Sequence, residues 1–494
     1  MSDRKDDIAD KIAHAPLNTL RSKIGLVARL TWPAIMAQMS MIVCEYIDAA
    51  MVGSLGAEPA AGIGLVSTTT WLFWGLGVAA ATGFAVQVAH QIGADNNRDA
   101  RSTLRQAIIV IACWGLILGL AGVALSGPLP HWLGGNEAVC VDSTAYFFWF
   151  AISLPFMLLT NMSAAMLRCS GNMLLPGIVN VAMCVMDVIF NFFLIYQTRT
   201  VTILGSEIIM PGAGWGVEGA AIGSGLAFSV GGVIMFTHLL RRSPRLRGAF
   251  REAARPFRLS GTTLRRAAVI SWPMALERIV MCGAQILITA IVAPLGTAAI
   301  AANSFAITAE SLCYTPGFGV GDAGTTLVGQ SLGAGRKPLA FSFARICLVA
   351  GMGIMAVLGV VMWIFAPEMM ALFTPDETVR ALGTMALRTE AWAEPMFGAA
   401  IVCYCICVGA GYTKIPAMVN FGSIWIVRLT LSAILAPKLG LFGVWLAMCI
   451  ELCVRGLVFL FIFVRRSWIN KAKVLSREQE LADDSAPEET PLVM

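Results

Sequence analysis

Long apolar segments follow one another along almost the whole chain, and they constrain its fold more than any other feature. Each has about 20 mostly apolar residues, the length that a helix needs to cross a bilayer. Hydrophobic residues make up 57% of the 494 residues, charged residues only 13%, and the mean hydropathy is +0.75. A water-soluble enzyme could not bury so much apolar surface, and a disordered chain needs low hydrophobicity and high charge. We therefore predict an all-α polytopic membrane protein.

We expect twelve transmembrane helices, because polar or turn-forming stretches such as Gly93–Arg98 and Gly333–Pro338 divide the apolar sequence into that number of spans. A β-barrel of the outer membrane would instead show short segments of alternating hydrophobicity. Six spans fall in each half of the chain. The expected spans are residues 30–53, 60–91, 106–127, 143–167, 173–197, 215–240, 267–293, 298–331, 340–366, 384–410, 415–437 and 441–465.

The distribution of Lys and Arg predicts the orientation of these spans. With a cytoplasmic N-terminus, 28 of the 35 basic residues fall in cytoplasmic tails and loops, as the positive-inside rule requires. We therefore expect a multi-pass protein of the cytoplasmic (inner) membrane with both termini in the cytoplasm. Nine arginines between residues 241 and 266 form a linker that we expect to meet anionic lipid headgroups. The net charge of +5 needs no nucleic acid to explain it.

The second half of the chain repeats the first at an offset of 240 residues. Trp32-Pro33 matches Trp272-Pro273, and Gly93-Ala94 matches Gly333-Ala334. Because each half has an even number of spans, the two halves have the same orientation, and such parallel repeats place a substrate site near their interface. The repeat predicts an N-terminal tail, an N-lobe, a basic linker, a C-lobe and a C-terminal tail. Their residues are 1–29, 30–240, 241–266, 267–466 and 467–494.

Two prolines at matched positions are candidate hinges. Pro33 lies in the first span and Pro273 in the seventh, and each removes a backbone hydrogen bond and can kink its helix. A kink that changes with the state of an ion site and a static kink suited to packing both fit this pattern. The repeat breaks only before the sixth span, where the loop near residues 198–213 carries extra residues.

Acidic residues lie inside the spans, where a charge costs at least about 2.5–3.5 kcal/mol. Such groups face a cavity or pair with a partner, so each acid has either a transport role or a structural one. Nine acids against three arginines favour an acidic cavity, which suits cationic substrates and coupling cations. The acids within the spans or near their ends are Glu45, Asp48, Asp187, Glu218, Glu277, Glu310, Asp322, Glu394 and Glu451.

Four segments in order resemble the motifs of the MATE (multidrug and toxic compound extrusion) transporters. They are residues 48–56 (DAAMVGSLG), 167–176 (LRCSGNMLLP), 328–335 (VGQSLGAG) and 409–416 (GAGYTKIP). The resemblance covers roughly residues 25–465. It implies export of organic cations and other amphipathic compounds, driven by the inward flow of protons or sodium ions.

The resemblance also implies a coupling-cation site in the N-lobe. Asp48 falls on the acidic position of the first-helix motif, and Asp187 and Asn191 supply the acid and amide of the fifth helix, in the reverse of the usual order. Asn180 offers a further amide two turns earlier. If Asp48 and Asp187 approach each other, their repulsion favours binding of one proton. Sodium, the alternative, would make Asp48, Asp187 and Asn191 a metal site; we favour protons.

Other charged and polar residues are candidates for the substrate cavity. Glu45 lies one turn before Asp48 and can face the same cavity, as can Tyr46, and Gln285 is the partner of Glu45 in the repeat. Glu310 and Asp322 stand twelve residues apart on the eighth span and face different directions. At least one of these two acids can be structural.

Glu277 is a candidate for an ion site in the C-lobe. In another branch of the family a seventh-helix Glu acts in coupling, at the position of Met281, and Glu277 lies one turn earlier. Pairing of Glu277 with Arg278 or Arg428 is the structural alternative. That branch also has a tenth-helix Asp, whose position near Ala399 holds no acid here, and this favours the N-lobe site.

Arg428 in the eleventh span needs an acid, and Glu277, Glu310 and Glu451 are the candidates. Arg455 and Glu451 stand four residues apart on one helix, so we expect a structural pair there.

The sequence thus predicts a secondary antiporter that works by alternating access and is no enzyme. We find no phosphate-binding loop and no nucleophile–base set, and we expect no cofactor apart from the coupling ion. The expected partners are organic cations and the lipid bilayer, and the chain is expected to be a monomer. The alternative is a flippase for lipids or lipid-linked oligosaccharides with a related fold, whose cavity would need cationic residues to hold pyrophosphate.

Overall fold

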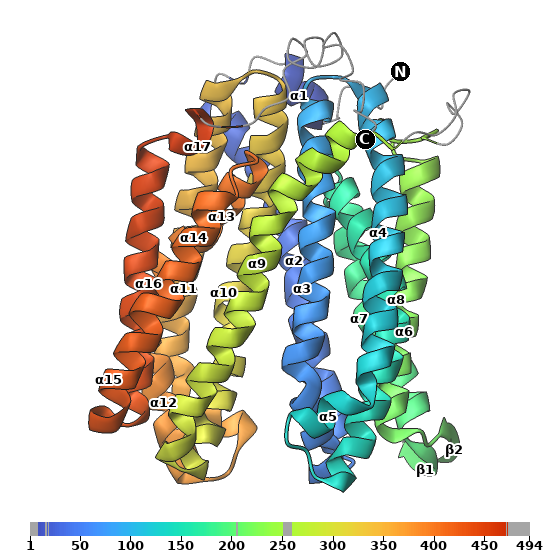
Figure 1. Cartoon of the computed structure of the whole chain (residues 1–494), viewed down its shortest axis with the longest axis vertical. Helices are drawn as coiled ribbons and strands as arrows, with labels where there is room; N and C mark the ends of the chain where they lie inside the picture. Colours follow the sequence, from blue (N-terminus) through green and yellow to red (C-terminus); the bar gives the residue numbers. More distant parts are fainter. Residues whose placement is uncertain are drawn as a thin grey trace, which may run out of the picture.

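The computed structural model contains two bundles of long helices that lie side by side (Figure 1). It describes residues 8–14, 17, 19–203, 206–249, 259–470 and 472. A short helix, α1 (Ile8–His14), precedes the first bundle, which we call the N-lobe. The N-lobe contains α2 (Leu20–Gly53), α3 (Ala57–Gly93), α4 (Asn97–Ser126), α5 (Pro128–Trp132), α6 (Glu137–Cys169), α7 (Leu174–Ile195), β1 (Gln197–Ile203), β2 (Ser206–Ala213) and α8 (Gly216–Arg241).

The second bundle, the C-lobe, repeats this plan with two irregular spans. Its elements are α9 (Gly261–Val292), a 3-10 turn η2 (Ala293–Leu295), α10 (Thr297–Gly333), α11 (Lys337–Phe373), α12 (Glu377–Glu390), α13 (Glu394–Gly409), α14 (Lys414–Gly422), a π-helical segment η3 (Ser423–Arg428), α15 (Leu429–Leu439), α16 (Leu441–Val464) and α17 (Ser467–Asn470). α12 and α13 meet at an angle of 61°. α14, η3 and α15 form one span, Lys414–Leu439.

Within the described residues, ten helices are long and apolar enough to cross a membrane, and α12 with α13 makes an eleventh candidate. The remaining expected span, residues 298–331, is the 37-residue helix α10. Most residues in the second half of α10 are buried by other helices, so this helix can be less apolar than one that faces lipid. The fold is thus an all-α membrane fold with the twelve spans that the sequence predicts.

Three details differ from the predicted elements. α2 begins at Leu20, not near residue 30, because Thr19 caps the helix through its side chain and the helix continues beyond the apolar run. The tenth span is not one straight helix but the bent pair α12 and α13. The loop near residues 198–213 contains an antiparallel hairpin, in which β1 pairs with β2, whereas the sequence predicts only helices.

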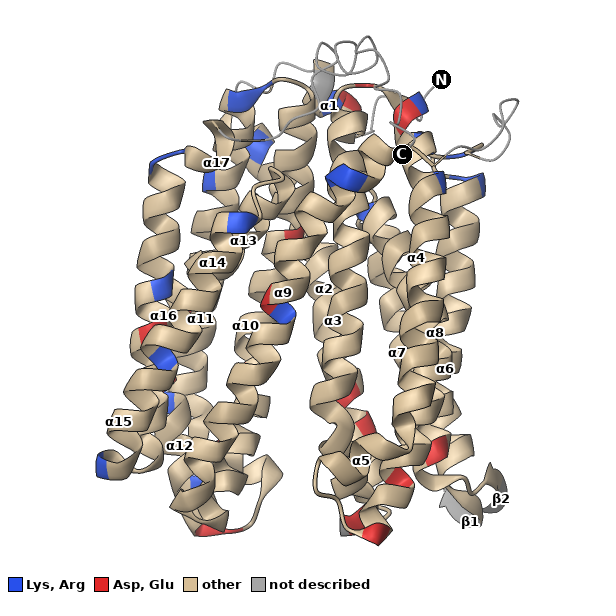
Figure 2. Ribbon diagram, in the orientation of Figure 1, with Lys and Arg blue, Asp and Glu red and all other residues tan. Residues whose placement is uncertain are grey.

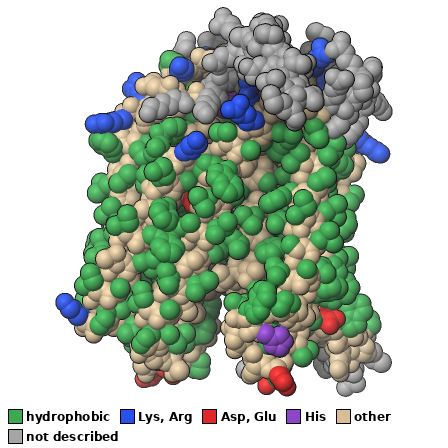
Figure 3. All heavy atoms as spheres, in the orientation of Figure 1, with side chains coloured by type: hydrophobic (Ala, Val, Ile, Leu, Met, Phe, Trp, Pro, Cys, Tyr) green, Lys and Arg blue, Asp and Glu red, His purple; other side chains and the backbone are tan. Residues whose placement is uncertain are grey.

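Charge distinguishes the two ends of the bundle (Figure 2). Lys and Arg gather at the end that holds α1 and α17, which we call the basic end. The opposite end holds α5, β1 and β2, and we call it the hairpin end. Hydrophobic side chains cover the sides of the molecule, and a notch separates the two lobes at the hairpin end (Figure 3).

The lobes touch at the basic end through two glycines that are equivalent in the repeat. A Cβ atom on Gly93 of α3 would lie 2.1 Å from the backbone oxygen of Gln330, and one on Gly333 of α10 would lie 2.0 Å from that of His90. Only glycine permits this close approach of two backbones. The backbones of the two lobes are therefore in direct contact at the basic end.

α1 lies across the basic end and contacts both lobes. Ile8 and Ile12 are buried in the hydrophobic core of the C-lobe side. Arg245, which follows α8, bonds Asp10 at 2.5 Å, and Arg336, which precedes α11, bonds the Ile12 carbonyl at 2.6 Å. Residues 250–258 of the expected linker and residues 473–494 of the expected C-terminal tail lie outside the described part of the chain.

Candidate functional site

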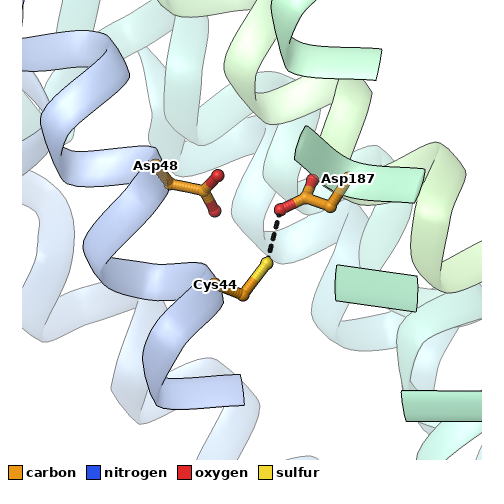
Figure 4. A group of neighbouring side chains, drawn as sticks. All are labelled: Cys44, Asp48 and Asp187. Atoms are coloured by element: carbon orange, nitrogen blue, oxygen red, sulfur yellow. Dashed lines mark hydrogen bonds between the residues drawn. The ribbon is translucent and has the colours of Figure 1, made fainter. Parts of the chain in front are cut away.

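Three of the four expected N-lobe site residues meet between α2 and α7. The amide Nδ2 of Asn191 donates to Asp48 Oδ1 at 2.8 Å and to Asp187 Oδ1 at 3.3 Å. Asp48 comes from α2, whereas Asp187 and Asn191 stand one turn apart on α7, and the two carboxylates face each other (Figure 4). We call Cys44, Asp48, Asp187 and Asn191 the α2–α7 cluster.

Packing against α8 holds the amide in place. Asn191 is fully buried, and Asp187 is only 4% exposed. A Cβ atom on Gly223 of α8 would lie 2.0 Å from Asn191 Oδ1. Glycine at this position therefore gives the Asn191 side chain the room it needs, and the amide turns its nitrogen to the two carboxylates.

Cys44 also belongs to the cluster, although it is not among the residues that the sequence predicts for this site. Its Sγ donates to Asp187 Oδ2 at 2.8 Å (Figure 4). One ligand atom from each of Cys44, Asp48 and Asp187 lies within 4.8 Å of the other two. Cys44 stands four residues before Asp48, so the helical spacing alone places both side chains on one face and would have identified the thiol.

The cluster can bind a cation. Two carboxylates this close repel each other unless a proton or a metal ion lies between them. Removal from water strengthens that repulsion, and the surroundings supply no counter-charge, since no Lys or Arg among the described residues forms an ion pair with either acid. The geometry therefore suits a site that loads and releases a positive charge.

Other residues expected in this region lie around the cluster. Asn180 is partly buried on α7, two turns before Asp187, and makes no hydrogen bond to the cluster in the described structure. Glu45 is exposed on α2. Tyr46 crosses to the C-lobe instead: its hydroxyl bonds the Thr308 carbonyl and lies 3.1 Å from Ser311 Oγ, both on α10.

Glu277 of α9 has neutral partners in the C-lobe. Tyr404 Oη of α13 donates to Glu277 Oε2 at 2.7 Å, and Asn420 Nδ2 of α14 donates to Oε1 at 2.6 Å. No ion pair to either candidate arginine is found for Glu277 in the part of the chain that the structure describes. Tyr404 and Asn420 were not selected from the sequence, but Asn420 is the partner of Asn180 at the offset of 240.

Arg428 pairs with Glu451, one of its three candidate acids. Its Nη2 lies 3.2 Å from Glu451 Oε2, and Arg455 Nε lies 3.1 Å from Oε1 of the same acid. Ser423 Oγ also donates to Glu451, which is fully buried. Arg428 is the last residue of the π-helical segment η3, which packs against α16. Two arginines and one acid thus form a buried network within the C-lobe.

Glu310 gathers with two further buried acids in the C-lobe. Its carboxyl group contacts that of Glu390, and Glu394 lies near both. All four carboxylate oxygens of Glu390 and Glu394 are buried without a hydrogen-bond partner in the described structure. Glu390 and Glu394 flank the bend between α12 and α13, a feature that sequence periodicity does not reveal.

Asp322 stands apart from Glu310, as their spacing predicts. It accepts a bond of 3.3 Å from Gln38 of α2 and lies 4.0 Å from Arg168 Nε of α6, so it connects the lobes. Gln285 is exposed on α9. Pro33 and Pro273 both lie inside continuous helices, α2 and α9.

Comparison with known proteins identifies the fold and the family. The family model described as MatE matches residues 33–193 and 273–434. The chain is 25% identical over 456 residues to a probable multidrug resistance protein NorM of Thermotoga maritima, covering 91% of this chain and 94% of that protein. It is 26% identical over 489 residues to a probable multidrug resistance protein NorM of Mesorhizobium japonicum, and the match covers 93% of this chain and 97% of that protein.

Solved transporter structures share this architecture. A mutant of the Vibrio cholerae MATE transporter VcmN superposes with a TM-score of 0.81 at 19% identity, covering 91% of this chain and 99% of that one. An outward-facing multidrug resistance MATE family transporter of the MOP superfamily superposes with a TM-score of 0.81 at 19% identity. The match covers 91% of this chain and 97% of that one. Both halves of the internal repeat match the family, and the whole bundle matches its fold. The chain therefore belongs to the MATE family of multi-pass membrane transporters.

Proposed function

We propose that this transporter exports organic cations and other amphipathic compounds in exchange for a cation that binds the α2–α7 cluster. The observation that carries the proposal is the facing pair Asp48 and Asp187, joined by the Nδ2 group of buried Asn191. Two facing carboxylates are more stable with one bound cation than with none. Binding and release of that cation therefore change the charge of the α2–α7 cluster. The similarity to NorM proteins that are named as probable multidrug resistance proteins supports the substrate class.

The orientation of the amide favours protons over sodium. Asn191 turns its nitrogen, not its oxygen, to the carboxylates. A sodium ion is held by several oxygen atoms, and here the amide supplies a donor that competes with a metal ion for the same carboxylate oxygens. A proton needs only one carboxylate oxygen and leaves the amide bonds to the others in place.

The contacts between the lobes support an alternating-access cycle. We place the basic end in the cytoplasm, following the positive-inside rule. The lobes then touch on the cytoplasmic side through Gly93 and Gly333, and a notch lies between them on the outer side (Figure 3). In this outward-open form an external cation would load the α2–α7 cluster and displace the drug, and rocking of the lobes would expose the cavity to the cytoplasm.

The alternative, a flippase for lipid-linked oligosaccharides, requires free positive charge to hold a pyrophosphate group. Arg455 is buried in the C-lobe and Arg428 is partly buried there, and both pair with Glu451. Uncompensated acids outnumber them, since Glu310, Glu390 and Glu394 cluster without a basic partner within 4 Å in the described structure. The charge pattern favours a cationic cargo.

Reconstituted vesicles test the proposal. The purified transporter is placed in liposomes, ethidium is added, and a proton gradient and a sodium gradient are imposed in separate runs. The proposal predicts ethidium movement against its gradient when protons flow in the opposite direction. Movement with sodium alone would keep the antiporter and replace its coupling ion. Failure of both gradients to drive ethidium, in vesicles shown to contain correctly inserted protein, would overturn the antiporter.

A further inference from the structure

We propose that the α2–α7 cluster also binds a thiophilic divalent cation, Zn²⁺ or Cd²⁺, with Cys44, Asp48 and Asp187 as ligands and Cys184 as the fourth. This inference deepens the proposed function, because it names a regulator of the coupling site. It starts from the cysteine of the cluster, which neither proton nor sodium binding uses.

The helices present the four ligands as two pairs. Cys44 and Asp48 stand four residues apart on α2, and Cys184 and Asp187 stand three apart on α7, so each pair lies on one helix face. The two faces meet: Cys44 Sγ lies 2.8 Å from Asp187 Oδ2. The thiols of Cys44 and Cys184 also contact each other. Three donors, from Cys44, Asp48 and Asp187, thus converge within 4.8 Å of one another, and Cys184 lies next to Cys44.

The distances are close to those of a tetrahedral metal site. Zinc binds sulfur at about 2.3 Å and carboxylate oxygen at about 2.0–2.2 Å, which places tetrahedral donors about 3.5 Å apart. One ligand atom each from Cys44, Asp48 and Asp187 already lies within 4.8 Å of the other two. Rotation of side chains on fixed helices can therefore close the site around an ion.

The chemistry of the donors selects the ion. Thiolate ligands favour zinc and other soft ions over Na⁺, Ca²⁺ or Mg²⁺. On binding, Cys44 and Cys184 each exchange a thiol proton for a sulfur–metal bond, and both protons leave to water, so that two thiolates and two carboxylates surround the divalent ion. Asn191 supplies support from outside the ligand set: it is fully buried, its Nδ2 donates to both carboxylates, and its Oδ1 has no partner in the described structure.

Binding of such an ion would block coupling. The metal and the coupling cation require the same oxygens of Asp48 and Asp187, so they exclude each other. A divalent ion held by sulfur leaves slowly, and it would hold the transporter in one state. Low concentrations of Zn²⁺ or Cd²⁺ are therefore expected to inhibit export through this site.

Direct binding to the purified full-length protein tests the inference. Cys449 and Cys453 form another pair of thiols in contact, so the reference protein carries Cys449→Ser and Cys453→Ser. Cd²⁺ is titrated in and the ultraviolet charge-transfer band of the cadmium–thiolate bond is recorded. We expect one equivalent of Cd²⁺ to produce the band. Cys44→Ser in this background should weaken Cd²⁺ binding at least tenfold, and Cys184→Ser should weaken it less. Cys113→Ser, an exposed thiol on α4, is the matched control and should change nothing.

A band of equal strength and affinity in the Cys44→Ser protein, or no band in the reference protein, would overturn the metal site. Inhibition of ethidium export by Cd²⁺ gives a second readout, and Cys44→Ser should raise the inhibitory concentration at least tenfold. The binding readout needs no transport. Export without cadmium binding would therefore refute only the metal site, and cadmium binding without gradient-driven export would refute only the antiporter.

Discussion

His90 and Gln330 stand at equivalent positions of the two lobes, 240 residues apart, and each reaches across to the end of a helix in the other lobe. His90 Nε2 of α3 lies 2.9 Å from the Gly409 carbonyl oxygen at the end of α13. Gln330 Nε2 of α10 donates to the Cys169 carbonyl at the end of α6 at 2.7 Å. Gly409 and Cys169 are themselves 240 residues apart. The internal repeat therefore produces a reciprocal lock at the basic end.

Loss of one half of this lock should open the basic end. Gln330→Ala leaves the buried Cys169 carbonyl without its partner, at a cost of about 1–3 kcal/mol to the closed form. We expect the Cys169 thiol, buried here, to react faster with N-ethylmaleimide, as followed by peptide mass spectrometry. Gln285→Ala, an exposed glutamine on α9, is the control. Unchanged Cys169 labelling in Gln330→Ala would show that the bond does not hold the lobes together.

A side chain at the glycine contact should prevent closure by steric overlap. Gly333→Ala puts a methyl group 2.0 Å from the His90 carbonyl oxygen, where backbone atoms cannot move aside cheaply. We expect ethidium export to fall at least tenfold, because the transporter can no longer adopt the conformation in which the lobes are closed at the basic end. Gly353→Ala on α11 is the matched control, since no atom lies within 4 Å of its Cβ position. Equal export by the two variants would contradict the close approach of α3 and α10.

The network around Glu451 should be a stability element. Glu451→Gln leaves Arg428 and Arg455 without their buried acid, and breaking a buried ion pair costs about 3–5 kcal/mol. The apparent Tm in detergent should fall by several degrees. Glu368→Gln, an exposed acid on α11, should leave the Tm unchanged. A Glu451→Gln protein as stable as wild type would mean that the arginines do not depend on Glu451.

Support of Asn191 by α8 gives a prediction about coupling. Gly223→Ala would place a methyl group 2.0 Å from Asn191 Oδ1 and displace the amide from the two carboxylates. Export should then need a steeper proton gradient, because the two carboxylates lose the amide that holds them in place to receive one shared cation. The measurement is the pH dependence of ethidium export. Gly64→Ala on α3, where nothing lies within 4 Å, is the control, and an identical pH profile for both would contradict the prediction.

The sequence predicted the elements that depend on long, uniform patterns. Twelve apolar spans, the two lobes and the meeting of Asp48 with Asp187 and Asn191 all follow from hydropathy, the repeat or the family motifs. Cys44 was within reach of the same reasoning, because its spacing to Asp48 puts both on one helix face.

Tertiary geometry decides the rest. The bend that brings Glu390 next to Glu310 depends on how α12 and α13 pack. The periodicity of a single helix does not predict it. The pairing of Arg428 with Glu451 instead of Glu277 depends on how the π-helical segment η3 packs against α16. The bonds from Tyr404 and Asn420 to Glu277 likewise join three separate helices.

Gradient-driven ethidium export by Asp48→Asn tests the central claim most directly. The substitution keeps the size of the side chain and its contact with Asn191, but it removes one of the two facing carboxylates. Glu58→Gln at the start of α3 is the matched control. With equal amounts of both proteins in vesicles, the account predicts export at the background rate for Asp48→Asn and at the wild-type rate for Glu58→Gln. Wild-type export by Asp48→Asn would contradict the coupling role of the α2–α7 cluster.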